Sequence, residues 1–218
     1  GKGQLWAAAA DGTPRRGSGG DAESGAFVME LFGSSSYGAI GAAVNPRDPF
    51  LMVGQGCEWR LDPKTGRSAC VGVVSRDGMG ASRFGTGPGN RLYLAVTPGF
   101  LHDSCPIRIF ERLGDAQYKL RAALRPVEKA GAGGKKQRVT EVWSDANDDE
   151  QEQPDEVKSY AVELGGWFQG WYMSMTPDLT FYGTCYQAKV TGWTACGAPL
   201  YDLDQAKRIA GPEDARHR

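Results

Sequence analysis

Six oxygen-bearing residues recur at regular spacing in one acidic stretch of the sequence. Ca²⁺ takes about six to eight oxygen ligands, and a twelve-residue loop supplies them from positions 1, 3, 5, 7, 9 and 12, using a backbone carbonyl at position 7. The residues at those positions are Asp145, Asn147, Asp149, Gln151, Gln153 and Glu156. The spacing predicts one Ca²⁺ site, which Mg²⁺ fits less well because it demands a tighter octahedral geometry. The alternative is a solvated acidic turn.

Position 6 of this segment departs from the usual loop. The backbone turns sharply there and favours glycine, whereas this chain has Glu150. The flanking segments 139–143 and 157–164 have the composition of strands rather than helices. We therefore expect a calcium loop that connects strands, with either a reduced affinity or a different turn.

Three further motifs could carry chemistry, and each has a simpler structural interpretation. The Asp62 to Arg67 segment is typical of a turn with a glycine bulge that closes a hairpin. His102 and Cys105 could form a nucleophilic pair, but a histidine in a loop is the favoured interpretation. Aromatic residues cluster between positions 167 and 193, where core packing is favoured over a ligand platform. No catalytic residue is predicted.

The five cysteines form no CxxC motif, and their odd number leaves at least one thiol unpaired within the chain. Cys185 and Cys196 flank an expected turn and are the favoured disulfide. A tight turn after Asp62 would place Cys57 opposite Val71, so Cys70 would point to the other face. Buried free thiols are the alternative.

Strand signals dominate the elements that must position these residues. Glycine is abundant, with 31 residues, and there are 12 prolines, which suits many short strands joined by turns. Helical periodicity is nearly absent, since segments 118–124 and 202–209 read equally well as strands. The sequence predicts an all-β fold. Strands are expected at 26–32, 50–53, 91–96, 107–112, 139–143, 158–164, 170–175 and 179–182.

A loose repeat places an aromatic residue before a turn. Trp59 and Phe110 are 51 residues apart, and Phe110 and Tyr201 are 91 apart. Periods of about 40–50 residues with several strands each are typical of propeller blades. We therefore expect Trp59, Phe110, Trp143 and Tyr201 to occupy equivalent strands of successive four-stranded blades, with a β-sandwich as the alternative.

Four segments resemble secreted bacterial β-propeller proteins of the NHL and PQQ-like kind. They are WRLDPKTGR, IRIFERLGDAQYKL, VWSDANDDEQEQPDE and GWTACGAPLYDL, and the resemblance covers residues 50–209. It implies export to the periplasm or the extracellular space, and a calcium loop inserted in a blade. The chain would then be a whole small propeller or part of a larger one. The resemblance does not imply PQQ, because Cys70 stands where the docking tryptophan of quinoprotein repeats would be.

The expected function is a calcium-binding propeller that acts as a binding or scaffold module for a protein or polysaccharide. The alternative is a propeller enzyme, either a polysaccharide-active hydrolase or lyase or a quinoprotein-like oxidoreductase. A net charge of −1 disfavours nucleic acid as a partner, and no apolar run approaches the length of a membrane span. Residues 1–25 are expected to form a flexible arm, 26–209 the blades and 210–218 a tail. The chain begins without Met, which suggests processing, trimming or a fragment.

Overall fold

In the part of the chain that the computed structural model describes, the regular elements are strands and single-turn 3₁₀ segments, which confirms the predicted all-β class. Segment 118–124 lies within a long strand, β10. The 3₁₀ segments are Pro88–Asn90, Pro154–Glu156 and Leu203–Gln205. No described helix has the length and apolar character needed to span a membrane. The structure describes residues 5–8, 14–17, 42–54, 56–75, 81–97, 106–130, 136–162, 174–182 and 186–208.

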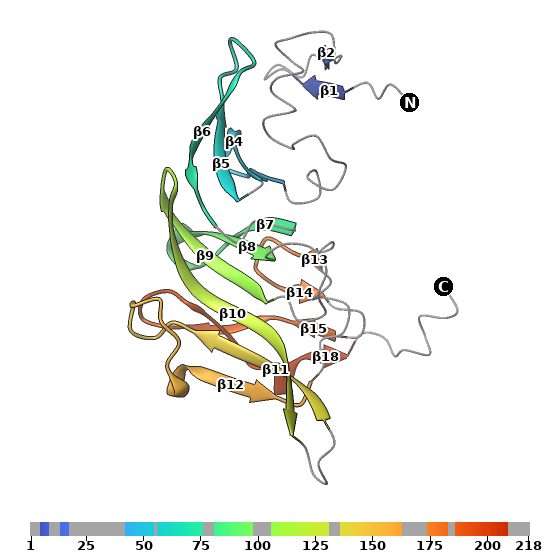
Figure 1. Cartoon of the computed structure of the whole chain (residues 1–218), viewed down its shortest axis with the longest axis vertical. Helices are drawn as coiled ribbons and strands as arrows, with labels where there is room; N and C mark the ends of the chain where they lie inside the picture. The colour runs from blue at the N-terminus through green and yellow to red at the C-terminus, as the bar shows by residue number, and fades with distance from the viewer. Residues whose placement is uncertain are drawn as a thin grey trace, which may run out of the picture.

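A six-stranded antiparallel sheet forms the centre of the described structure (Figure 1). Its strands follow one another in chain order as a meander. They are β7 (Ala81–Thr86), β8 (Leu92–Thr97), β9 (Ile107–Gly114), β10 (Gln117–Ala130), β11 (Lys136–Ser144) and β12 (Val157–Tyr160). Every residue of β8 is buried, in line with its nearly continuous apolar sequence. Both faces of this sheet are therefore covered.

A four-stranded meander packs against one face of the central sheet. Val53 of this meander is buried together with Leu94 and Val96 of β8, and Phe84 and Phe110 pack around them. The meander consists of β3 (Ala43–Asn45), β4 (Asp48–Gly54), β5 (Cys57–Leu61) and β6 (Ser68–Val73). In Figure 1 it is drawn in cyan and teal and lies above the central sheet.

Shorter strands cover the other face, where β8 presents Tyr93 and Ala95. Phe181 and Tyr201 pack against each other there, with ring centroids 5.7 Å apart. One sheet contains β13 (Ser174–Met175), β14 (Phe181–Tyr182), β15 (Tyr186–Ala188) and β18 (Lys207–Arg208), and a second contains β16 (Val190–Trp193) and β17 (Pro199–Tyr201). The odd and even residues of β8 thus serve two different cores.

The expected repeat is only partly matched by the sheets. Trp59 lies on β5, the third strand of its meander, and Phe110 lies on β9, the third strand counted from β7. Trp143 shares the six-stranded sheet with Phe110, and Tyr201 lies in a two-stranded sheet. The prediction of one equivalent strand per blade is therefore wrong for these four residues taken together. The sheets formed by the described strands are all open.

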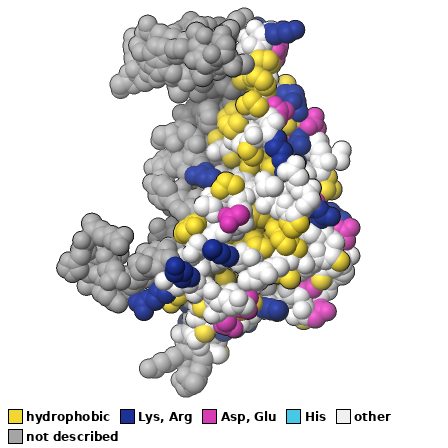
Figure 2. Space-filling view, turned by 180° about the vertical axis from the view of Figure 1, so that it is seen from behind, with side chains coloured by type: hydrophobic (Ala, Val, Ile, Leu, Met, Phe, Trp, Pro, Cys, Tyr) yellow, Lys and Arg dark blue, Asp and Glu magenta, His cyan; other side chains and the backbone are white. Residues whose placement is uncertain are grey.

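Three predicted regions fall wholly or largely outside the described residues. The expected strand at 26–32 lies there, as do most of the N-terminal arm and the whole of the C-terminal tail. Within the expected arm, β1 (Leu5–Ala8) and β2 (Pro14–Gly17) pair antiparallel. Seen from behind, the described surface mixes basic, acidic and hydrophobic side chains (Figure 2), which agrees with the near-zero net charge.

Candidate functional site

The predicted calcium segment is the connection between β11 and β12. β11 ends at Ser144 and β12 begins at Val157, so residues 145–156 form a complete strand-to-strand loop. Glu156 closes it: its Oε1 accepts from the Ala146 N–H at 2.8 Å, and its Oε2 accepts from Trp143 Nε1 at 2.8 Å. The first and last predicted ligands therefore lie at the two ends of a closed loop between strands, as the sequence indicates.

Three predicted ligands converge at the outer part of the loop. Asp149 Oδ2 accepts from Gln153 Nε2 at 2.7 Å and from Asn147 Nδ2 at 3.2 Å. Its Oδ1 accepts from the Gln151 N–H at 2.8 Å. This backbone hydrogen bond is the main reason why the pKa of Asp149 lies below its usual value. Asp149 is thus the centre of the predicted ligand set.

The loop turns at Glu150 with a φ of 62°, in the left-handed region that position 6 of such a loop requires. Asp148 also has a positive φ, of 72°. Glu150 Oε2 accepts from the Leu120 N–H at 2.9 Å, which docks the loop on β10. The hydrogen bond offsets part of the backbone strain that a non-glycine residue has in this conformation.

A cation from the protein itself lies beneath the loop. The register of β9 against β10 shifts between Leu120 and Ala122, so Arg121 is the extra residue of a β-bulge. Bulges redirect side chains, and the Arg121 side chain is buried, with 5% of the residue exposed. Its guanidinium donates to Glu111 Oε2 at 2.9 Å, to Asp145 Oδ2 at 3.0 Å and to Asp148 Oδ1.

These ion pairs determine the charge at the base of the loop. Lys119 Nζ lies 2.7 Å from Asp148 Oδ1, and Lys119 together with Arg121 lowers the pKa of Asp148 to about 2. Burial alone would lower the pKa of Arg121, but its hydrogen bonds to Asp148, Glu111 and Asp145 raise it above the usual value. The guanidinium therefore stays charged, and together with Lys119 it balances the charges of Asp145 and Asp148.

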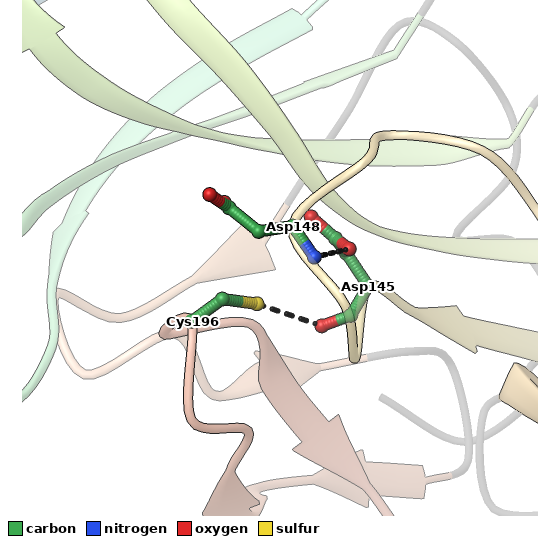
Figure 3. Close-up of side chains that lie close together, drawn as sticks. All are labelled: Asp145, Asp148 and Cys196. Carbon is green, nitrogen blue, oxygen red and sulfur yellow. Dashed lines mark hydrogen bonds between the residues drawn. The ribbon is translucent and has the colours of Figure 1, made fainter.

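Cys196 approaches the same carboxylates from the β16–β17 connection (Figure 3). Its Sγ donates to the Asp145 carbonyl at 3.0 Å, which also accepts from Thr194 Oγ1 at 2.9 Å. One ligand atom each from Asp145, Asp148 and Cys196 lie within 4.8 Å of one another. Cys196 is a free thiol, and Cys185, its predicted disulfide partner, lies outside the described residues.

The donor set of the loop fits a hard cation. The predicted ligands offer carboxylate, amide and backbone oxygens, which Ca²⁺ prefers. The Cys196 thiol at the base of the loop is not one of them. Gln153 Oε1 is buried and has no hydrogen-bond partner among the described residues. Buried acceptors nearly always have a partner, so a bound cation could supply the partner that this oxygen at position 9 lacks.

Sequence reasoning missed Arg121, Lys119, Asp148 and Cys196 at this site. Arg121 lies in a segment with the usual composition of a strand, and no local sequence pattern predicts the β-bulge that redirects its side chain. Asp148 falls at position 4, which carries no ligand in the expected loop. Cys196 arrives from a segment about fifty residues away in sequence, and only the packing of β16–β17 against the central sheet reveals this contact.

The other motifs take the simpler interpretations where they are described. Asp62 accepts from the Lys64 N–H at 2.9 Å and from Thr65 Oγ1 at 2.8 Å, and Gly66 has a φ of 71°, so the segment is a hairpin turn. Trp193 packs on Tyr93 with ring centroids 5.2 Å apart, as expected for core packing. Residues 102–105 and 167–172 lie outside the described residues.

Comparisons with protein-family models, with curated proteins and with solved structures give no match for this chain. The candidate site therefore has to be argued from its own geometry.

Proposed function

We propose that residues 145–156 bind one Ca²⁺ ion and that this ion fixes the β11–β12 loop of an exported all-β binding or scaffold module. The observation that carries the proposal is the grouping of Asn147 and Gln153 around the Asp149 carboxylate, to which both side-chain amides donate. A buried amide oxygen of Gln153 without a partner lies in the same loop. Asp145 and Glu156 would complete the ligand set from the base, and Gln151 would add its carbonyl.

The charge of the loop supports a divalent cation. Residues 145–156 include seven acidic side chains and no basic one. Lys119 and Arg121 neutralise Asp145 and Asp148, and Arg125 pairs with Glu152. Asp149 and Glu156, in contrast, accept only N–H donors in the described part of the chain. Carboxylates held close together repel one another unless a cation intervenes.

Ca²⁺ should therefore stabilise the folded state by mass action, by about 2.7 kcal/mol at a concentration of 100 times Kd. The test is a set of thermal melts in chelator, in Ca²⁺ and in Mg²⁺, combined with calorimetric titration. Asp149→Asn is the informative variant because it removes a central ligand charge that Arg121 does not contact. Asp145 is less suitable, because its carboxylate also holds the buried guanidinium.

The matched control is Asp155→Asn, which changes a loop carboxylate outside the proposed ligand set. We expect Ca²⁺ to raise the melting temperature of wild type and of Asp155→Asn, more than Mg²⁺ does, and to have little effect on Asp149→Asn. If wild type melts at the same temperature in chelator and in millimolar Ca²⁺, and titration detects no binding, the segment is only an acidic turn.

The open sheets support the proposed scaffold role. The four-stranded meander β3–β6 packs on one face of the six-stranded meander β7–β12, an arrangement that stacked propeller blades would also have. Blades bury their faces only by stacking on neighbours, so we propose that a further part of a larger propeller, or a protein or polysaccharide partner, covers the outer surface. Sedimentation or scattering of the complete natural protein would test this, because a closed propeller is compact and an open stack is elongated.

A further inference from the structure

Cys57 and Cys70 lie on neighbouring strands at the outer side of the β3–β6 meander. β5 and β6 pair with Leu61 opposite Ser68, Arg60 opposite Ala69 and Trp59 opposite Cys70. This register differs by one residue from the one that the turn sequence suggests, and a one-residue slip moves a side chain to the other face. Cys57 and Trp59 share a face, so Cys57 and Cys70 share it too.

The two side chains lie close together as well as on one face. A β-bulge between Glu58 and Trp59 adds Val71 to β6. The Cys70 thiol donates to the Gly72 carbonyl at 3.9 Å, and it lies close enough to Cys57 to raise the pKa of the Cys57 thiol. Both are free thiols, and Cys70 is exposed while Cys57 is half-buried. β6 is an outer strand of its sheet, so a small reagent in solution can reach Cys70.

We propose that Cys57 and Cys70 form a disulfide when the protein meets a small disulfide oxidant such as oxidised glutathione. The Cys70 thiolate attacks one sulfur of the oxidant, forms a mixed disulfide and releases one thiolate. The Cys57 thiolate then attacks Cys70 Sγ and displaces the second thiolate. One S–S bond is exchanged for another, the two cysteines lose two protons and two electrons, and the oxidant leaves as two reduced thiols.

The order of attack follows from the surroundings of the two thiols. Burial raises the pKa of Cys57, and the neighbouring Cys70 raises it further, so Cys57 is the poorer first nucleophile. It is well placed as the second one because it lies near Cys70 on the same face of the β5–β6 pair. The product would close the hairpin around the turn at Asp62, next to Glu58, through which the meander is bonded to the central sheet.

The cysteine spacing allows a direct test by tryptic mapping. Arg60, Lys64 and Arg67 stand between the two cysteines, so trypsin separates peptide 48–60, which contains only Cys57, from peptide 68–76, which contains only Cys70. The full-length chain is incubated with a mixture of reduced and oxidised glutathione, alkylated and digested without reductant. We expect these two peptides to be recovered joined, and reduction to release them.

Variants distinguish this pair from other pairings. Cys70→Ser should abolish the joined peptide and leave Cys57 alkylated, whereas Cys196→Ser should retain it. The melting temperature of wild type and of Cys196→Ser should be higher after oxidation than after reduction, and that of Cys70→Ser should not gain this increment. Recovery of both peptides alkylated, of Cys57 joined to any other cysteine, or of a stable glutathione adduct on Cys70 would overturn the proposal.

Discussion

Glu58 on β5 and Arg112 on β9 form a two-point ion pair that joins two separate sheets. Arg112 Nε donates to Glu58 Oε2 at 2.9 Å, and Arg112 Nη2 donates to Glu58 Oε1 at 3.1 Å. The Tyr118 hydroxyl and the Ala116 N–H donate to the same carboxylate. The Glu58 side chain is completely buried, so four donors satisfy a charge that water cannot reach.

Glu58→Gln should strongly destabilise the protein, because it leaves the Arg112 guanidinium poorly paired at the interface between the sheets. Breaking one partner of a buried ion pair costs about 3–5 kcal/mol, and Asp115, which also pairs with Arg112, should keep the loss near the lower end. Urea denaturation measures it. Glu128→Gln is the control, since its pair with Lys136 is exposed, and it should leave the midpoint unchanged.

The same carboxylate predicts a loss of stability in acid. Burial alone would raise the pKa of Glu58, but hydrogen bonds from Arg112, Tyr118 and the Ala116 N–H more than offset it, so its folded pKa lies below the usual 4.5. A depressed folded pKa contributes stability above the unfolded value and loses it as pH falls through the folded value. Wild type should therefore lose stability progressively below about pH 4.5, and Glu58→Gln should show a shallower slope in urea melts between pH 5 and 3. Equal slopes would contradict this role of Glu58.

Gly72 should be intolerant of a side chain, because the two sheets approach closely there. A Cβ at Gly72 would lie 2.5 Å from Ala116 Cβ, and such overpacking costs about 1–3 kcal/mol. Ala116 itself has a φ of 51°, so Ala116→Gly removes both the clash and a strained backbone. Gly72→Ala should be destabilised, and the double variant Gly72→Ala, Ala116→Gly should recover most of the loss. A double variant as unstable as Gly72→Ala alone would exclude this contact as the cause.

Much of the fold could be predicted from local patterns. The strands predicted at 50–53, 107–112 and 139–143 lie within β4, β9 and β11, and the one predicted at 91–96 is shifted by one residue from β8. The division of the strands into sheets could not be predicted. Trp143 was expected in a different blade from Phe110, but its strand β11 belongs to the same six-stranded sheet as β9. Sheet membership depends on pairing between strands, and one sequence contains no direct record of that pairing.

The candidate site, too, was predictable only where it depends on local sequence. The loop boundaries, the turn at Glu150 and the grouping of Asn147 with Asp149 follow from spacing within twelve residues. The position of Arg121 does not follow from this spacing, because its burial depends on a one-residue bulge in β10. In the same way, the closeness of Cys57 to Cys70 depends on the register of β5 with β6. Register and bulges are set by packing against other sheets, so they lie beyond short-range sequence patterns.

Glu150 offers the sharpest test of how the loop is built. Its left-handed backbone costs about 1–2 kcal/mol for a residue with a side chain, while its hydrogen bond to the Leu120 N–H returns about 1 kcal/mol. Glu150→Ala should keep the strain and lose the hydrogen bond, which destabilises the protein by about 1 kcal/mol. Glu150→Gly should lose both, and its unfolding midpoint in urea should stay close to that of wild type. Because Glu150 is not among the proposed ligands, Ca²⁺ should still raise the melting temperature of Glu150→Gly. Equal destabilisation of the alanine and glycine variants would show that the φ of 62° at this position does not control the loop.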